Sequence, residues 1–198
     1  MTSIPVILLA AGTSSRMGGK DKLLQPVDGI PLLRRTALRA LSAGPLWVAL
    51  PPSPHPRFEA LAGLDLNTVA VPDRQEGMNA SLRRAIAALP VHCHAAMVLL
   101  ADLPDLTAED LTKVLNVADQ DREHLIWRGT TDDGAPGHPV IFHSELFPEL
   151  LALTGDGGAQ SVVERHRDAT CFVPLAGKRA RLDLDTPEAW ESWQKSRS

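Results

Sequence analysis

Residues 4–22 read IPVILLAAGTSSRMGGKDK, an apolar run that passes directly into a loop of small residues ending in cations. The run Ile4–Leu9 is apolar without alternation, as in a strand that is buried on both faces. The glycine and hydroxyl residues after it let the backbone approach a ligand and turn N–H groups toward an anion. Arg16 and Lys22 add full positive charge, and Lys20 is a further candidate. The stretch therefore predicts a triphosphate-binding loop behind a buried strand.

Two common phosphate loops do not fit this stretch. A Walker loop requires glycine where Ser14 stands and a hydroxyl residue where Asp21 stands. A Rossmann fingerprint also requires glycine at Ser14. The plain alternative is an ordinary strand-to-helix connection with solvated cations.

Composition indicates one α/β domain over residues 1–198, with enough apolar residues for a substantial core. Lys and Arg total 20 against 24 acidic residues, and no basic block occurs, which argues against a nucleic-acid partner. No basic segment precedes the first apolar run, so we expect no signal peptide, no membrane association and a cytoplasmic location. Cys93 and Cys171 do not make a disulfide framework and are expected to be idle thiols. The run His92–His94 could hold a metal, but no second ligand cluster stands near it in the sequence.

Apolar runs alternate with stretches of helical period over residues 1–120, which predicts a mostly parallel sheet covered by helices. Strands are expected near Ile4–Leu9, Leu46–Leu50, Thr68–Val71 and Ala95–Leu100, and helices near Leu32–Ser42, Met78–Leu89 and Thr107–Ala118. We expect this part to bind a nucleotide, because the phosphate loop belongs to it.

The pattern is less regular over residues 121–198, which we expect to bind an acceptor and supply a second metal ligand. A Gly/Asp/Pro-rich stretch, a short strand, a helix and a glycine-rich turn are expected at Gly129–Pro139, Val140–Phe142, Ser144–Thr154 and Gly155–Gly158. A last helix is capped by Thr186 and opened by Pro187, and its Trp190 and Trp193 share a face.

Two carboxylates are placed to hold a metal ion. Asp102 follows a predicted strand, and ligands of doubly wound sheets sit beyond the carboxyl ends of strands. A triphosphate carries its Mg²⁺ through one or two carboxylates, so a second acid is needed. Asp185, or else Asp183, meets that need because it ends an apolar stretch before a capped helix. Alternatively, Asp102 forms a turn ahead of Pro104 and Asp185 assists the helix cap.

Two further segments could contact substrates. Gly77, Met78 and Ser81 open a helix after a polar loop, which leaves backbone amides and a hydroxyl for a base or ribose. The segment Gly137-His138-Pro139 puts an imidazole on a constrained backbone, where it could touch an acceptor. An ordinary helix start and a surface histidine are the plain alternatives.

Five groups of segments carry a family resemblance. They are Leu9–Gly12 with Arg16–Gly18 and Asp21–Lys22, Gly77–Met78 with Ser81–Leu82, Asp102 with Pro104, Gly137–Val140, and Asp183–Glu188. Together they resemble the nucleotidyltransferases of molybdenum-cofactor maturation, a branch of the NTP-transferase superfamily, over nearly the whole chain. The first group is shared with sugar-nucleotide and methylerythritol cytidylyltransferases, but the latter carry Pro-Lys-Gln where Lys22 is followed here by Leu23.

Within that branch, the cytidylyltransferases look like L-A-A-G at the strand end and the guanylyltransferases like L-A-G-G. Ala11 therefore favours molybdenum cofactor cytidylyltransferase, because a methyl group there narrows the pocket for a base. Two features differ from the cytidylyl pattern. Leu103 stands where those members usually have glutamine, and the spacing from Arg16 to Lys22 is that of guanylyl members.

The resemblance implies a Rossmann-like three-layer α/β/α nucleotidyltransferase fold that transfers CMP from CTP to the terminal phosphate of molybdopterin. Catalysis is implied for Arg16, Lys22 and Asp102, with Mg²⁺ on Asp102 and Asp185. The nucleotide is expected to contact Leu9, Ala10, Ala11, Gly12, Arg16, Lys22, Gly77, Met78 and Ser81, and the acceptor Gly137, His138, Pro139 and Asp156.

Other readings stay open. GTP could replace CTP as donor, a sugar or alditol phosphate could be the acceptor, and a non-catalytic molybdenum-cofactor carrier would belong to a different class. A molybdoenzyme or its insertion chaperone is a candidate protein partner.

Overall fold

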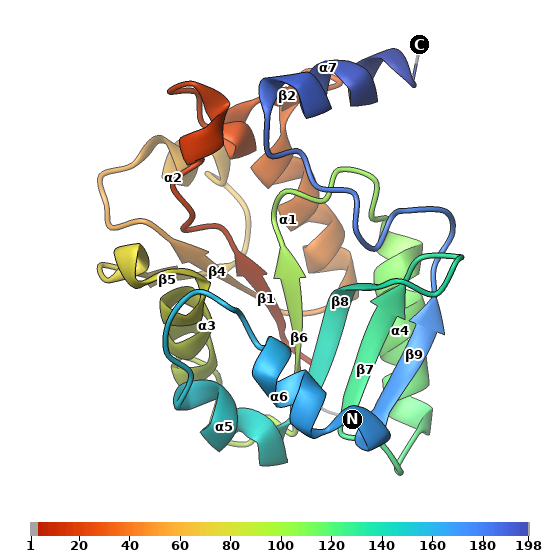
Figure 1. The fold of residues 1–198 in the computed structure, drawn as a ribbon. Helices are drawn as coiled ribbons and strands as arrows, with labels where there is room; N and C mark the ends of the chain where they lie inside the picture. The colour runs from red at the N-terminus through yellow and green to blue at the C-terminus, as the bar shows by residue number, and fades with distance from the viewer. Residues whose placement is uncertain (1–3, 198) are drawn as a thin grey trace.

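A seven-stranded sheet forms the centre of the computed structural model, which describes residues 4–197 (Figure 1). Its strand order is β5-β4-β1-β6-β8-β7-β9. The strands are β1 (Val6–Leu9), β4 (Leu46–Leu50), β5 (Asn67–Ala70), β6 (Ala95–Leu100), β7 (Ile126–Thr130), β8 (Pro136–His143) and β9 (Thr170–Pro174). In this sheet of the described residues, β8 alone runs antiparallel to its neighbours. The predicted mostly parallel sheet is confirmed.

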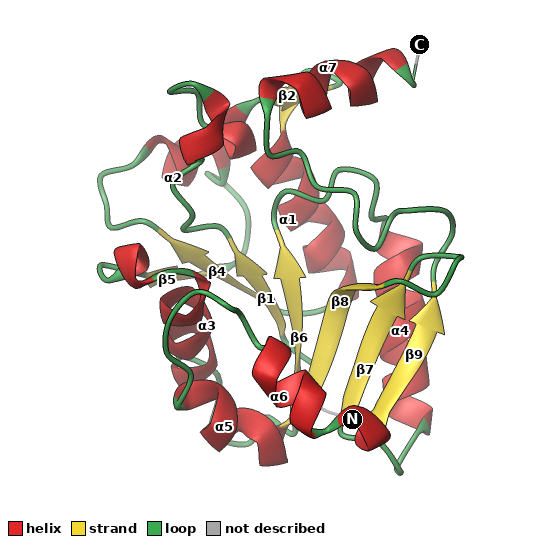
Figure 2. Ribbon diagram, in the orientation of Figure 1, coloured by secondary structure: helices red, strands yellow, loops and turns green. Residues whose placement is uncertain are grey.

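Helices cover both faces of the sheet, so the fold has three layers (Figure 2). They are α1 (Leu32–Ala43), α2 (Pro56–Ala60), α3 (Met78–Ala87), α4 (Ala108–Gln120), α5 (Phe147–Leu151), α6 (Gln160–Arg165) and α7 (Pro187–Lys195). Helices α1 and α4 share an apolar cluster with Leu8 of β1, whereas α3, α5 and α6 share a second cluster with Ile7. Because successive side chains of a strand point to opposite faces, β1 is buried on both.

The order of the strands fixes where a ligand can enter. From β1 the chain continues to β4 and β5 on one side and then crosses back to β6 on the other. Ligands of open α/β sheets bind outside the carboxyl ends of the strands at such a reversal of order. The loops after β1 and β6 meet there. A small hairpin, β2 (Pro26–Val27) with β3 (Ile30–Pro31), lies outside the main sheet.

The second half of the chain contains more sheet than its sequence predicts. The expected strand Val140–Phe142 is part of the eight-residue β8, and β7 and β9 were not predicted. Charged and small residues within β7, Arg128 and Gly129, interrupt the apolar signal on which a strand prediction depends. The helix expected over 144–154 is shorter: a 3₁₀ turn at 144–146 leads into α5, which ends at Leu151.

The C-terminal helix docks as the sequence predicts. The Thr186 hydroxyl accepts from the Ala189 N–H at 3.2 Å, and Pro187 occupies the first turn of α7. Trp190 and Trp193 are buried and pack edge to face, with ring centroids 5.9 Å apart. Over the described part of the chain, no helix combines the length and apolarity needed to cross a bilayer.

Candidate active site

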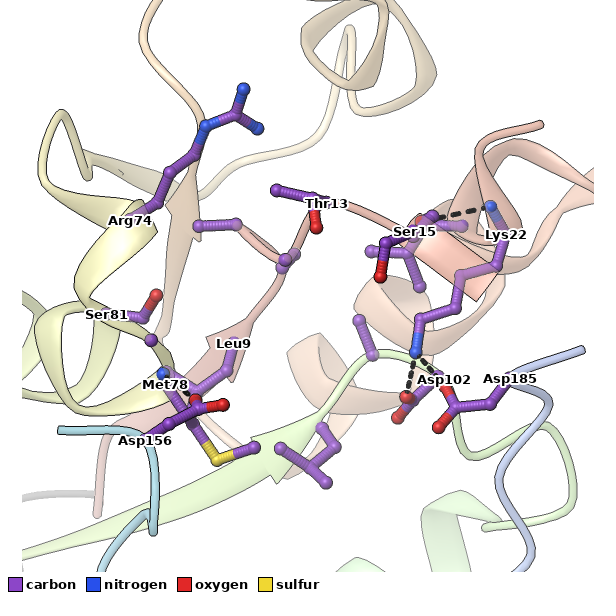
Figure 3. A pocket seen from close by; sticks show the side chains of 18 of the residues that line it. Leu9, Thr13, Ser15, Lys22, Arg74, Met78, Ser81, Asp102, Asp156 and Asp185 are labelled. Atoms are coloured by element: carbon purple, nitrogen blue, oxygen red, sulfur yellow. Dashed lines mark hydrogen bonds and ion pairs between the residues drawn. The ribbon is translucent and has the colours of Figure 1, made fainter. Parts of the chain in front are cut away.

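A cavity of about 500 Å³ opens at the carboxyl ends of β1 and β6 (Figure 3). Its walls come from the loop after β1, the first turns of α3, the end of β6 and the segment before α7. Twelve of the residues that the sequence nominates line it: Leu9, Ala10, Ala11, Gly12, Arg16, Lys22, Gly77, Met78, Ser81, Asp102, Asp156 and Asp185. Gly137, His138 and Pro139 do not. The cavity also takes in Thr13, Arg74 and Gln75, which sequence reasoning missed.

The loop after β1 owes its shape to residues with positive φ. Ser14, Gly18 and Gly19 have backbone φ angles of 53°, 60° and 87°, which residues other than glycine rarely adopt. Met17 is buried between them and fastens the loop to the core. The backbone therefore folds back on itself around the cavity instead of continuing as a helix.

A buried arginine, Arg57 of α2, holds the two ends of this loop together. Its Nε and Nη2 donate to the two carboxylate oxygens of Asp21 at 2.8 Å each, and its Nη1 donates to the Ala10 carbonyl at 2.6 Å. Its side chain is 2% exposed. In the sequence Arg57 looks like one more surface cation, because its partners lie 36 and 47 residues away.

Asp21 also fixes the backbone of the next residue, Lys22. Besides binding Arg57, its carboxylate accepts from the Leu23 N–H at 3.0 Å and so caps the 3₁₀ turn Lys22–Leu24. Leu23 is buried on the other side of that turn. The backbone of Lys22 is therefore fixed on both sides, and its side chain reaches across the cavity.

The Lys22 ammonium donates to Asp102 Oδ2 at 2.5 Å and also to Asp185 Oδ1 (Figure 3). Arg16 donates to Asp185 Oδ2. Burial acts to lower the pKa of Lys22, but the attraction of the two carboxylates outweighs it and raises that pKa. Burial acts to raise the pKa of Asp185, but the hydrogen bond and charge of Lys22 outweigh it and lower that pKa.

Two contacts bring the Asp185 segment to Asp102. The Leu184 N–H donates to the Asp102 carbonyl at 3.3 Å. The indole of Trp190 donates to the Leu184 carbonyl at 3.2 Å. The docking of α7 thus places a carboxylate from the end of the chain beside one that follows β6.

The acidic residues here fit a divalent cation. Asp102, Asp183 and Asp185 each contribute an oxygen, and these atoms lie within 4.8 Å of one another. Asp102 Oδ1 is buried and has no hydrogen-bond partner among residues 4–197. Burial, followed by the neighbouring Asp185, raises the pKa of Asp183. Oxygen ligands in a cluster of like charges are what Mg²⁺ or Mn²⁺ requires. Asp183, expected only as an alternative to Asp185, lies in the same cluster.

At the opposite end of the cavity, Asp156 caps helix α3. Its Oδ1 accepts from the Met78 N–H at 2.7 Å. Gly77 has a φ of 101°, and a Cβ there would lie 2.5 Å from that same oxygen. Ser81 is buried one turn further along α3 and lines the cavity. Asp156, which the sequence assigns to the acceptor, therefore shapes the same end of the cavity as Gly77, Met78 and Ser81.

Successive side chains of β8 point to opposite faces of the sheet, so the residues expected to bind an acceptor do not all face the same way. His138 and Val140 line a second, smaller cavity on the α6 side of the sheet. Pro139 belongs to the other face. A Cβ at Gly137 would lie 2.1 Å from the Ala180 carbonyl oxygen, so this glycine serves the close approach of another chain segment.

His138 is half-buried, not the surface histidine that the sequence left as its plain alternative. Desolvation lowers the pKa of His138 to about 4, so its imidazole is neutral near pH 7. Both cysteines are free. Within the described residues, no candidate metal group includes His92–His94.

Comparison with known proteins defines the family. Residues 6–170 match the model of the MobA-like NTP transferase domain. The chain belongs to this family. The match contains the loop after β1, the first turns of α3 and Asp102, and it ends before Asp185.

Relatives extend the likeness over the whole chain. The purine catabolism protein PucB of Bacillus subtilis is 27% identical, over 97% of this chain and 96% of its own length. The molybdenum cofactor guanylyltransferase of Serratia proteamaculans is 26% identical, over 96% and 94%. The crystal structure of Rv0371c from Mycobacterium tuberculosis is 29% identical with a TM-score of 0.85, covering 98% of both chains. A structure of Rv0371c in complex with manganese has a TM-score of 0.82, at 27% identity over 98% of this chain and all of the other.

Replacing Arg57 tests its role in the loop. We expect Arg57→Ala to lower the free energy of unfolding by about 3 kcal/mol, because it leaves the Asp21 carboxylate without its partner. Arg57→Lys keeps the charge but cannot form the bidentate hydrogen bonds with the Asp21 carboxylate. We expect this variant to fold and to bind inorganic tripolyphosphate about tenfold more weakly in calorimetric titration.

Arg165→Lys serves as the matched control, because Arg165 forms an exposed pair with Glu149. We expect it to change neither stability nor tripolyphosphate binding. Wild-type affinity in Arg57→Lys would contradict the role given to Arg57.

Proposed function

We propose that this nucleotidyltransferase transfers CMP from CTP to the terminal phosphate of molybdopterin, with release of pyrophosphate. The observation that carries the proposal is the meeting of a phosphate-type loop and its cations with Asp102 and Asp185 in one cavity. A protein that only stored a bound cofactor would not need these carboxylates. The names of the guanylyltransferase relatives support molybdopterin as the acceptor.

The acceptor needs little activation. A phosphate monoester has a second pKa of about 6, so at neutral pH it is already an anionic nucleophile. One of its oxygens attacks the α-phosphorus of CTP, and the bond from that phosphorus to the bridging oxygen breaks. Pyrophosphate leaves with the electron pair. The protein's task is therefore to position the two phosphates and to offset the growing negative charge.

Each part of that task has candidate residues. The backbone from Ala10 to Gly12 lies beside the phosphates, and Arg16 and Lys22 offset the charge on the leaving pyrophosphate. Asp102 and Asp185, with Asp183 beside them, would hold Mg²⁺. When bound, the ion neutralises charge on the phosphoryl oxygens. The manganese complex of Rv0371c supports a divalent ion in this family.

The choice of CTP depends on Ala11. This residue is 1% exposed, lies two positions after the end of β1 and lines the cavity. Its methyl group narrows the space beside the base, which favours a pyrimidine over a purine. GTP is the second candidate donor, because several relatives are named molybdenum cofactor guanylyltransferases.

Pyrophosphate release tests the reaction. With Mg²⁺, CTP and molybdopterin, we expect the wild type to release pyrophosphate and Asp102→Asn to lose at least a hundredfold in rate at an unchanged melting temperature. The loss follows from removing a carboxylate that holds the metal. A near-normal rate in Asp102→Asn would remove the metal role. Failure of the wild type with every nucleotide would favour the carrier reading.

Substitution at Ala11 tests the donor. One methyl group contributes about 1–3 kcal/mol of discrimination, so we expect Ala11→Gly to shift the ratio of kcat/KM for CTP over GTP about tenfold toward GTP. Ala88→Gly, at the C-terminal end of α3, is the control for replacing alanine by glycine and should leave the ratio unchanged. An unaltered ratio in Ala11→Gly would show that selection lies elsewhere.

A further inference from the structure

The second cavity, of about 150 Å³, adjoins the first and has no role in nucleotide binding as proposed above. The two cavities share Leu9 and Met78 in their walls. Most of the second is apolar, with Val98, Val140 and Phe142 from the sheet and Val163 from α6. An apolar hollow that adjoins the first cavity is suited to the flat part of a substrate.

One cation in this cavity lacks a counter-charge. Arg128 of β7 is half-buried and lines the cavity, and its Nε donates to the Gly137 carbonyl at 3.0 Å. It forms no ion pair with any carboxylate of residues 4–197. Burial, and then the charge of Arg181, lower the pKa of Arg128. A partly buried guanidinium is costly unless an anion neutralises it, so this position is suited to an anionic ligand.

His138 lines the same cavity as Arg128. The imidazole of His138 interacts electrostatically with both Arg128 and Asp102. His138 also faces β6, because its Nδ1 lies 3.4 Å from the Val98 carbonyl oxygen, and Asp102 follows that strand.

An exposed aromatic side chain lies next to Arg128 in the sheet. Strand β9 places Phe172 directly beside Arg128, and this ring is 45% exposed. Arg128 shares its cavity with Gln160 and Val163 of α6. The part of the sheet beside Arg128 therefore presents an aromatic ring to solvent.

We propose that the second cavity is the acceptor subsite, in which Arg128 binds the phosphate of a phosphomonoester and the apolar walls hold its ring. Calling the ligand the acceptor rests on the proposed function. The substrate class is a phosphomonoester that carries a flat ring system. Of the residues that the sequence assigned to the acceptor, His138 remains in the subsite.

Phenyl phosphate is a suitable probe, because it combines a flat ring with a phosphomonoester. The first cavity is filled with Mg²⁺ and non-hydrolysable α,β-methylene-CTP, and phenyl phosphate is then titrated by calorimetry. We expect binding of one equivalent, which Arg128→Gln weakens ten- to a hundredfold through loss of a charge-assisted hydrogen bond. The affinity of Arg128→Lys for phenyl phosphate should lie between those of the wild type and Arg128→Gln. Arg122→Gln, on the exposed turn after α4, is the matched control and should bind as the wild type does.

The outcomes separate this proposal from the proposed function. Absence of binding to the wild type, or wild-type affinity in a folded Arg128→Gln, would overturn the subsite. If Arg128→Gln does not fold, Arg128→Lys decides the question in the same way. Arg128-dependent binding without pyrophosphate release from CTP or GTP would keep the subsite and reject the proposed reaction.

With an active enzyme, kinetics provide a second readout. We expect Arg128→Gln to raise the KM for the phosphorylated acceptor at least tenfold and to leave the KM for the nucleotide within twofold. A rise in both constants would indicate a general structural role and contradict the assignment to the acceptor.

Discussion

The ammonium of Lys22 joins two carboxylates that lie 80 and 163 residues away along the chain. Asp102, Asp183 and Asp185 repel one another, and a cation among them is what allows the end of the chain to close against the loop after β6. Arg57 and Asp21 hold the loop from which Lys22 projects, and α7 holds the segment that carries Asp185. Lys22, Asp102 and Asp185 therefore form an electrostatic junction between the loop after β1, the loop after β6 and the segment before α7. The strand pairing of the sheet does not by itself bring these three segments together.

This junction explains why the cavity has two different ends. Where cations and carboxylates meet, it is suited to phosphates and a divalent ion. At the other end, Gly77 allows Asp156 to approach and cap α3, and Ala11 and Ser81 line the cavity there. In the proposed function these two residues are the walls for the base. The strand order of the sheet aligns the two ends, because the loops after β1 and β6 flank the point where the order reverses.

The sequence predicts the parts that depend on local signals. The buried strand, the small-residue loop and the cap at Thr186 each follow from neighbouring residues, and the structure gathers the nominated loop residues with Asp102 and Asp185. Arg57 could not be predicted, because its role exists only once α2 packs against the loop. The strands β7 and β9 lack a clear alternating pattern. Gly137 and His138 belong to one sequence motif, which suggests a shared role. Adjacent residues of a strand face opposite sides of the sheet, however, so the two side chains have different surroundings.

Binding of Mn²⁺ measured by electron paramagnetic resonance, in the presence of CTP, tests most directly whether the carboxylates at the junction hold the metal. The account predicts one tight site in the wild type, weakened at least tenfold in Asp102→Asn and in Asp185→Asn. Asp65→Asn, at an exposed position away from the cavity, should bind as the wild type does. Undiminished Mn²⁺ affinity in both cavity variants would contradict the account.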